Sequence, residues 1–286
     1  MVIPFKKMQG LGNDFVVLDN LTGSLQFDAV TARRLADRKL GIGCDQILVL
    51  EAPKNTGTDL TMRIWNADGA EVEHCGNGAR CVARFAKDAG LVETDTVSIG
   101  LAKGVVTARL RSGGSVSINM GEPCFVPSEI PFIAANQALS YTLSVASGAG
   151  DVGAEDVSEI EIGAVSMGNP HAVIEVSDVA DADLATLGAA VQMHTAFPEG
   201  VNVGLVALRG RRCVDLRVYE RGVGETLACG TGACAAVAVL RSRAVVDNDV
   251  AVHLPGGRLD ISWAGPGQVL WMTGPASYVF EGEIAL

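Results

Sequence analysis

The sequence is organised around one stretch, Arg217–Ala233, which reads RVYERGVGETLACGTGA. Its apolar start predicts a strand, its glycines predict a turn, and the alanine-rich sequence from Cys229 to about Ser242 predicts a helix. A cysteine at a helix N-terminus lies where unpaired backbone N–H groups and the helix dipole favour a thiolate. The same N–H groups can bind a carboxylate. Small residues before such a helix are more often simple turn chemistry, so one copy alone decides nothing.

A second copy makes the cysteine significant. Arg63–Ala79 reads RIWNADGAEVEHCGNGA and aligns with Arg217–Ala233 without a gap, at a constant offset of 154 residues. The first arginine, one glutamate (Glu71 and Glu225), the cysteine, both following glycines and the final alanine are shared. A role in core packing does not explain why a cysteine, Cys75 or Cys229, stands at the same position of both copies, each time at the start of a predicted helix.

The repeat extends along most of the chain. Further matching blocks keep their order, at offsets of 153 to 156 residues, and this drift is what loop insertions produce. The blocks are Gly12–Asp19 with Gly168–Glu175, Asp45–Leu50 with Val201–Val206, and Val116–Gly121 with Val269–Gly274. The chain therefore contains an internal repeat of roughly 130 residues that occurs twice.

Each repeat is predicted to consist of strands that carry two helices. Helices are expected at residues 28–39, 77–89, 182–190 and 229–242, and strands at 96–111, 115–120, 249–253, 258–262 and 268–272. The alternating run at 105–110, followed by two glycines, is a hairpin signal. Residues 131–153 have no counterpart and are interpreted as the connection between the repeats. The predicted fold class is α+β, with two similar domains.

Composition limits the function classes. A hydrophobic content of 48% against 19% charged residues predicts a well-filled core in a soluble protein. The net charge of −11 argues against nucleic acid and against an anionic membrane surface as partners. No apolar run has the length of a membrane span, and the start lacks the layout of a signal peptide.

The seven cysteines indicate reduced thiols in the cytoplasm, because their number is odd and no pair has CxxC spacing. No metal site is expected, since cysteine and histidine do not cluster with ligand spacing. Five cysteines outside the repeated position are interpreted as small buried hydrophobic residues: Cys44, Cys81, Cys124, Cys213 and Cys234.

Two helix-borne cysteines suit one kind of chemistry. Domains related by a pseudo-two-fold axis would bring Cys75 and Cys229 to opposite walls of one cleft, where the active site is expected. A small molecule there would have a thiol group on each face of one carbon. One thiolate can then remove a proton while the opposite thiol returns one, which inverts the centre. A lone nucleophilic cysteine would need only one copy.

Polar residues recur in register with the cysteines and indicate an amino-acid substrate. Asparagine and glutamine can both donate and accept, as the ammonium and carboxylate groups of a zwitterion require. Arg221 suits a carboxylate, and His171 lies close to this set in the Gly-Asn-Pro-His run. The matching pairs are Asn13 with Asn169, Gln46 with Asn202, and Asn66 with Glu220.

No cofactor is expected. The six lysines all lie at or before Lys103, outside any motif of chemical character, so a Schiff-base lysine for pyridoxal phosphate is not indicated. Neither a dinucleotide-binding GxGxxG in a strand–helix context nor a phosphate-binding GxxxxGK[ST] occurs.

Seven ordered motifs resemble those of diaminopimelate epimerases, and the resemblance spans essentially the whole chain except for about Pro131–Glu159. The motifs are Gly10–Phe15 (GLGNDF), Gly41–Gln46 (GIGCDQ), Asn66–Gly69 (NADG), Cys75–Arg80 (CGNGAR), Gly168–His171 (GNPH), Glu220–Gly222 (ERG) and Ala228–Ala233 (ACGTGA).

The resemblance implies a cofactor-independent interconversion of LL- and meso-diaminopimelate by proton transfer between a thiolate and a thiol. This is a step toward lysine and, in many bacteria, peptidoglycan. The resemblance also implies a homodimer, and twin domains that are each a mixed, strand-rich sheet around a central helix. The final strand, near 276–286, would return to the first domain. The expected N-terminal lobe is then 1–118 plus about 275–286, and the C-terminal lobe is 119–274.

The same resemblance assigns roles to individual residues. Backbone amides at Gly76, Asn77, Gly230 and Thr231 are expected to bind the carboxylate of the reacting centre. The distal L-centre is expected to be recognised by Asn66, Asn202 and Arg221. The amino groups are expected to be oriented by Glu220 with Asn13, Gln46 or His171.

Two other readings stay open at this level. Proline racemases and hydroxyproline epimerases resemble the cysteine pair but need no recognition of a distal amino-acid centre, so Arg221 argues for the longer substrate. The other reading is a repeat protein without catalysis, or a thiol redox protein whose Cys75 and Cys229 form a regulatory disulfide. Which cysteine is the thiolate at rest is not decided by the repeat, because the two copies are alike.

Overall fold

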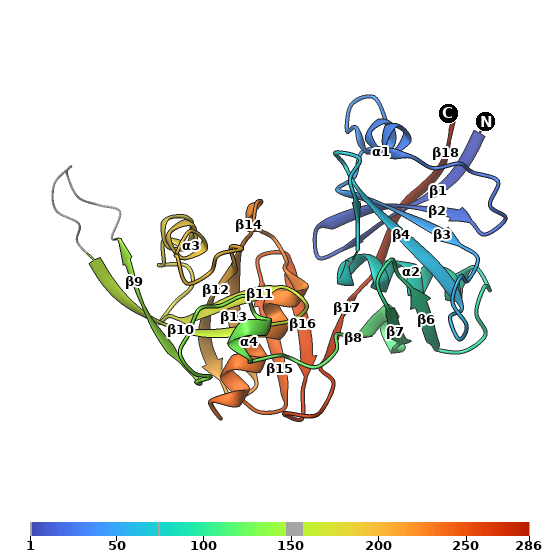
Figure 1. Cartoon of the computed structure of the whole chain (residues 1–286). Helices are drawn as coiled ribbons and strands as arrows, with labels where there is room; N and C mark the ends of the chain where they lie inside the picture. The colour runs from blue at the N-terminus through green and yellow to red at the C-terminus, as the bar shows by residue number, and fades with distance from the viewer. Residues whose placement is uncertain (1, 74, 147–156, 286) are drawn as a thin grey trace. The chain divides into compact units, whose positions relative to one another are not determined.

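The computed structural model describes residues 2–73, 75–146 and 157–285 (Figure 1). His74, interpreted from the sequence as loop, and residues 147–156 lie outside the described part of the chain. The chain divides into two compact units. The first consists of Met1–Asn119 with Thr273–Leu286, and the second of Met120–Met272.

The first unit is a mixed sheet with two helices. Its elements are β1 (Val2–Gly10), β2 (Asn13–Asn20), α1 (Ala29–Ala36), β3 (Gln46–Glu51), β4 (Leu60–Asn66), β5 (Glu71–Val72), α2 (Gly76–Asp88), β6 (Thr96–Gly100), β7 (Val105–Leu110), β8 (Ser115–Asn119) and β18 (Ser277–Ala285). β2 runs parallel to β3 and β4 runs parallel to β6, whereas β1–β2, β3–β4, β4–β5, β6–β7, β7–β8 and β1–β18 are antiparallel.

The second unit repeats this pairing scheme. β11–β12 and β13–β15 are parallel, and β10–β11, β12–β13, β13–β14 and β15–β16 are antiparallel. Its elements are β9 (Tyr141–Ala146), β10 (Val157–Ser166), β11 (Pro170–Glu175), α3 (Leu184–Gln192), β12 (Asn202–Gly210), β13 (Cys213–Glu220), β14 (Gly224–Thr226), α4 (Gly230–Ser242), β15 (Asp249–Leu254) and β16 (Gly257–Ser262). β17 (Trp271–Pro275) leads from this unit back into the first. The internal duplication predicted from the sequence is therefore confirmed.

The helix that follows each cysteine is the centre of its unit. In α4, the nine residues from Gly232 to Leu240 are all buried, and the helix contacts β10, β11, β12, β13 and β16. α2 contacts strands of the first unit in the same way and buries the seven residues from Asn77 to Ala83. A helix buried on all sides needs small residues, because strands must approach it from several directions. The alanine-rich sequence of α4 meets that need.

An equivalent ion pair joins the two strands that precede each central helix. Arg63 forms a bidentate ion pair with Glu71, through Nε–Oε1 at 2.6 Å and Nη2–Oε2 at 2.9 Å. Arg217 forms the same pair with Glu225, at 2.8 and 2.9 Å. Both join the long strand to the short strand that precedes the cysteine. The shared arginine and glutamate of the repeated stretch are thus explained by structure, not by chemistry at the site.

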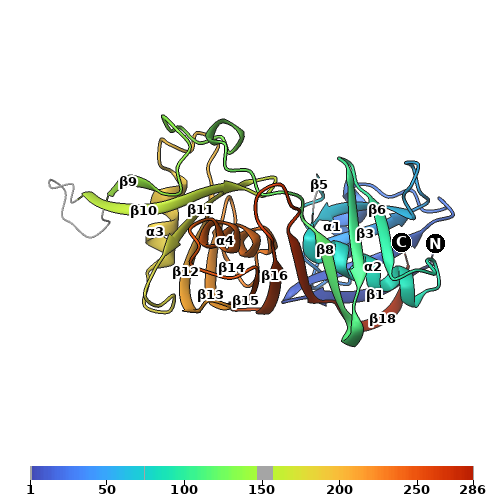
Figure 2. The same ribbon diagram turned by 90° about the horizontal axis from the view of Figure 1, so that it is seen from below.

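The C-terminal strand lies in the first unit, as expected. β18 pairs antiparallel with β1, with Val2 opposite Ala285 and Gln9 opposite Ser277, and the two strands run side by side in Figures 1 and 2. Phe5 of β1 packs edge-on against Phe280 of β18, with ring centroids 5.9 Å apart. The first unit is therefore built from both ends of the chain.

Two expectations from the sequence need correction. The region 131–153 is not only a connection, because β9 within it pairs antiparallel with β10. Cys124 and Cys213 are half-buried rather than buried, and each lies near a polar group: Cys124 Sγ donates to Glu129 at 3.2 Å, and Cys213 Sγ lies 3.9 Å from His253 Nδ1. Cys44, Cys81 and Cys234 are buried as expected. Among the described residues, none of the helices has the length and apolar character of a membrane span.

Candidate active site

Cys75 is the N-cap of α2. Its backbone is extended, with φ −154° and ψ 102°, and its Sγ accepts a hydrogen bond from the Gly78 N–H at 3.2 Å. The sulfur thus takes the place of the usual oxygen of an N-cap side chain. A Cβ at Gly78 would lie 3.0 Å from the Leu48 side chain and 3.3 Å from Cys75 Sγ. The glycine therefore lets the helix start close to both β3 and the sulfur.

Asn13 reaches the same helix end from a tight hairpin. β1 and β2 are joined by Leu11 and Gly12, which both have positive φ (58° and 86°), as a two-residue turn of this hand requires. A leucine in this conformation is unusual, and its buried side chain holds it there. Asn13 Oδ1 accepts from Asn77 Nδ2 at 3.4 Å. The first unit thus brings Asn13 and Asn77 together at the N-terminus of α2.

Gln46 and Asn66 form a second polar pair in this unit. They lie opposite each other on β3 and β4, and Gln46 Nε2 donates to Asn66 Oδ1 at 2.8 Å. Gln46 Oε1 is buried and has no hydrogen-bond partner among the described residues. A buried acceptor without a partner costs free energy. An ammonium group of a bound molecule can satisfy it.

Cys229 is the N-cap of α4 and is more buried than Cys75. Its exposed fraction is 4%, and Sγ lies 3.5 Å from Thr231 Oγ1. Burial and the nearby Glu220 carboxylate raise the pKa of the Cys229 thiol well above its usual range. Glu220 also accepts a hydrogen bond from Thr226 Oγ1 at 2.5 Å. The surroundings of Cys229 therefore favour the neutral thiol.

His171 is a buried neutral imidazole. Burial, and secondarily the positive charge of Arg221, lower its pKa to about 3. Its Nε2 lies 3.0 Å from Asn169 Oδ1, and Asn169 Nδ2 donates to Thr231 Oγ1 at 3.4 Å. His171, Asn169 and Thr231 therefore form a chain that ends beside Cys229.

Arg221 and Asn202 lie at the end of β13 and the start of β12. Asn202 Oδ1 accepts from the backbone N–H of Arg221 at 2.9 Å, and Asn202 Nδ2 donates to Pro170 O at 3.1 Å. The Arg221 side chain is exposed and donates to the carbonyl of Glu199 at 2.7 Å. Within the described ranges, no carboxylate of the chain pairs with Arg221. Its guanidinium keeps donors for a carboxylate from outside the chain.

Comparison with known proteins identifies the family of the chain. A family model described as diaminopimelate epimerase matches residues 5–126 and 163–279. The chain belongs to the diaminopimelate epimerase family. It is similar over the full length of both chains to the diaminopimelate epimerases of Nitrosomonas europaea, at 50% identity, and Pseudomonas syringae pv. tomato, at 48% identity. The family model leaves out 127–162, which contains the whole stretch of about 131–159 where the motifs of the family are absent.

Solved structures of other activities share the fold. A hydroxyproline epimerase from Agrobacterium vitis matches with a TM-score of 0.65 at 17% identity, over 100% of this chain and 93% of the other. A PhzF-family phenazine biosynthesis protein from Bacillus anthracis matches with a TM-score of 0.68 at 15% identity, over the whole of both chains. At these identities the likeness shows the fold alone: strand-rich α+β with a central helix in each unit.

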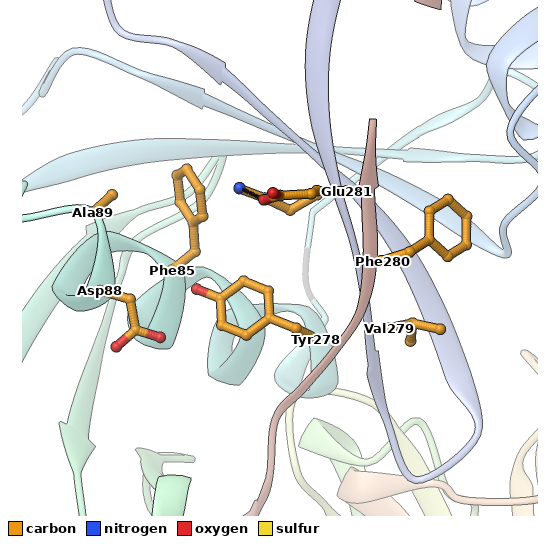
Figure 3. A pocket seen from close by; sticks show the side chains of 8 residues that line it. Phe85, Asp88, Ala89, Tyr278, Val279, Phe280 and Glu281 are labelled. Atoms are coloured by element: carbon orange, nitrogen blue, oxygen red, sulfur yellow. Dashed lines mark hydrogen bonds and ion pairs between the residues drawn. The ribbon is translucent and has the colours of Figure 1, made fainter. Parts of the chain in front are cut away.

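A separate hollow of about 520 Å³ lies at the other end of α2 (Figure 3). Its lining comes from the last turn of α2 with the C-cap residue Ala89, from Lys6 of β1, and from β18, which includes Tyr278 and Phe280. A 13-residue helix is about 20 Å long, so this hollow is remote from Cys75. It takes no part in the candidate site.

Each unit assembles its own share of the predicted site residues. Asn13, Gln46, Asn66, Cys75, Gly76 and Asn77 lie in the first unit, and Asn169, His171, Asn202, Glu220, Arg221, Cys229, Gly230 and Thr231 lie in the second. The sequence analysis missed Asp45 and Arg80, which both bond to residues of this set. Both stand inside quoted motifs, but their counterparts in the repeat, Val201 and Cys234, are apolar, so comparison of the repeats did not select them.

Proposed function

We propose that this protein interconverts LL- and meso-diaminopimelate by removing and returning one α-proton, in lysine biosynthesis. The observation that carries the proposal is membership of the diaminopimelate epimerase family together with a cysteine at the N-terminus of each central helix. The full-length relatives at 50% and 48% identity support the same substrate. The reaction creates and removes no net charge and exchanges only a proton, so two side chains that hold and release protons are sufficient.

The two cysteines are unequal at rest in this proposal. Cys75 is the thiolate, because its sulfur accepts the Gly78 N–H at the positive end of α2. Cys229 is the thiol, because its burial and Glu220 hold its pKa high. Cys75 then takes the α-proton from one face, and Cys229 delivers its proton to the other. The reverse reaction starts with the protonation states exchanged.

Recognition of the substrate follows from the remaining polar groups. Backbone N–H groups at Gly76 and Gly230 suit the carboxylate of the reacting centre, as helix N-termini suit anions. Arg221, with its free donors, suits the distal carboxylate. Gln46 Oε1 is an acceptor for an ammonium group. A shorter cyclic amino acid such as proline has no distal carboxylate for Arg221 to bind, which favours the longer substrate.

We further propose a homodimer that works in the cytoplasm. Family resemblance supports the dimer, and sedimentation equilibrium measures it directly. The cytoplasm suits a mechanism that needs both Cys75 and Cys229 reduced, because thiols persist there.

The deciding experiment is incubation with LL-diaminopimelate in deuterated water, with stereochemistry and α-deuterium followed together. The expected product is meso-diaminopimelate with deuterium at the inverted centre. Proline serves as the comparison substrate and should show no exchange. Turnover of proline but not of diaminopimelate would contradict the proposal.

Serine variants test the two-cysteine mechanism. Cys75→Ser and Cys229→Ser should each lower the epimerisation rate by about 10²–10⁴-fold, because each removes one general acid–base partner. Elimination from an analogue with a leaving group next to the α-carbon needs only one base, so each variant should keep it for one stereoisomer, opposite in the two variants. Equal elimination of the same stereoisomer by both variants would show that the cysteines do not serve opposite faces.

A further inference from the structure

We propose that Asp45 and Arg80 are positioning residues that fix the direction of hydrogen bonding through Asn13 and Asn77. They thereby decide which polar atoms the first unit presents beside Cys75. The inference rests on the proposed function, because its effect is measured as epimerisation. It concerns two side chains that bond to the site residues without belonging to the cysteine motif that the repeats share.

The four side chains form a continuous chain. Arg80 Nη2 donates to Asn77 Oδ1 at 2.9 Å, and Asn77 Nδ2 donates to Asn13 Oδ1 at 3.4 Å. Asn13 Nδ2 in turn donates to Asp45 Oδ2 at 3.0 Å. The central hydrogen bond, between Asn77 and Asn13, is longer than the usual 2.9–3.0 Å. The orientation of the two amide groups is therefore set mainly by the hydrogen bonds to the charged side chains at the two ends.

The chemistry of the ends allows only one direction. A guanidinium can only donate, so Arg80 requires the oxygen of the Asn77 amide. An ionised carboxylate can only accept, so Asp45 requires the nitrogen of the Asn13 amide. Turning either amide over would place two donors or two acceptors against each other. Asn13 and Asn77 each keep one further N–H, and two such donors suit the carboxylate of a substrate at the α2 N-terminus.

Both ends are held by the surrounding fold. Arg80 is fully buried, and its Nε donates to Pro275 O at 3.1 Å, in the segment that returns to the first unit. A Cβ at Gly10 would lie 3.0 Å from Arg80 Nη2, so the end of β1 leaves room for this side chain. At the other end, Asp45 Oδ1 accepts from Arg38 Nη2 at 2.8 Å, and Asp45 Oδ2 also accepts from the Asp14 N–H at 3.1 Å.

The second unit lacks this device. The counterparts of Asp45 and Arg80 in the repeat are Val201 and Cys234, and both are fully buried. There Asn169, which directly precedes β11, donates to the helix residue Thr231 instead of accepting from it. The equivalent hydrogen bond thus runs in the opposite direction. Among the described residues, charged groups end this chain of hydrogen bonds only at the Cys75 half.

Three variants test the proposal. Asp45→Asn and Arg80→Gln place groups that can donate or accept at the two ends, so the direction of the chain is no longer imposed, and Asp45→Asn does this without a change in side-chain shape. We expect kcat to fall by about 10- to 100-fold, as for a misplaced polar group at a reacting centre. Arg80→Lys can still only donate, and should recover part of the loss of Arg80→Gln.

A matched control separates positioning from stability. Arg84 lies one turn further along α2 and donates to Ala276 O in the same returning segment and to Asp88, away from Asn77. Arg84→Gln should lower Tm while kcat stays within about threefold of the parent, well short of the loss that misplacement at the reacting centre brings.

The outcomes are distinguishable. A parent protein that does not exchange the α-proton of diaminopimelate overturns the proposed function. A parent that turns over while Asp45→Asn keeps kcat within twofold overturns the present inference. A loss of kcat in Arg84→Gln as large as that in Arg80→Gln also overturns it. If Arg80→Gln does not fold, Asp45→Asn decides the matter, because that carboxyl side chain is 45% exposed and its removal is tolerated more easily.

Discussion

The two cysteines stand in matching motifs but have different surroundings. Cys75 is half-buried and accepts the Gly78 N–H, whereas Cys229 is buried next to Glu220 and Thr231. Both lie at a helix N-terminus, which favours a thiolate, but at Cys229 burial and the Glu220 carboxylate outweigh this effect and favour the neutral thiol. The surroundings of the two cysteines therefore supply the asymmetry that a two-base reaction needs.

The pH dependence of kcat/KM should be bell-shaped, with an alkaline limb above the ordinary range of a free cysteine, about 8.5. Activity is lost on the acid side when the general base of the proposed mechanism gains its proton. It is lost on the alkaline side when Cys229 loses its proton, and since burial and Glu220 raise the pKa of Cys229, this loss comes at higher pH.

Glu220→Gln removes one of the two causes of the raised pKa. Its alkaline limb should move to lower pH while the acid limb keeps its position, whatever the residual activity. Rate measurements across pH with the parent and the variant check this. An alkaline limb that stays in place in the variant would mean that Glu220 does not act on Cys229.

At the scale of elements, the helix N-termini are shaped by close packing as much as by dipoles. A Cβ at Gly232 would lie 2.9 Å from Val218 Cγ2 and 3.3 Å from Cys229 Sγ, and Gly78 is crowded in the same way. Because α4 must begin directly against β13, the second glycine after the cysteine leaves room for the strand and holds the sulfur at its place.

Gly232→Ala should therefore reduce both stability and kcat. Helix propensity alone predicts the opposite sign, a gain of about 1 kcal/mol on replacing glycine by alanine inside a helix. Displacing Val218 and Cys229 outweighs that gain, because overpacking typically costs about 1–3 kcal/mol. Thermal unfolding and epimerisation assays measure the two effects.

Ser242→Ala in the last turn of α4 is the matched control. Its hydroxyl donates only to Ala238 O in the same helix, so the change should leave kcat at the parent value. A Gly232→Ala variant that is more stable than the parent and fully active would contradict the packing argument.

At the scale of the whole molecule, the two units differ in how the chain forms them. The second unit is one continuous segment, Met120–Met272, whereas the first needs Thr273–Leu286 in addition to Met1–Asn119. β18 supplies the partner of β1 along Val2–Gln9, and Arg80 and Arg84 bind the carbonyls of Pro275 and Ala276. The first unit is therefore incomplete until the end of the chain is present.

Fragments should show this difference. Residues 120–272 expressed alone should unfold in one cooperative transition, since all their sheet partners are present. Residues 1–119 should show no such transition until a peptide of residues 273–286 is added or fused. Circular dichroism during heating measures both. A cooperative transition in 1–119 alone, at the same Tm as with the peptide, would contradict the expectation.

Much of the fold could be predicted because its signals are local or periodic. The helices α2 and α4 begin within one residue of their predicted positions, since the cysteine and the glycines mark their starts. The strand β9 was missed, because its pairing with β10 joins segments on both sides of a stretch without repeat or motif. The half-exposed Cys213 was read as buried, because its type favours burial and its neighbour His253 lies 40 residues away.

The sequence by itself determined the duplication, the α+β class, the two helix-borne cysteines and the polar residues that accompany them. These follow from patterns along one chain that repeat at a constant offset. Tertiary structure alone decided that burial and Glu220 raise the pKa of Cys229, and in which direction Asn13 and Asn77 donate. The direction of a hydrogen bond depends on which groups meet, and Asp45 and Asn13 lie 32 residues apart, whereas Arg80 and Pro275 lie 195 apart. Only folding brings such groups within 3 Å or so of each other.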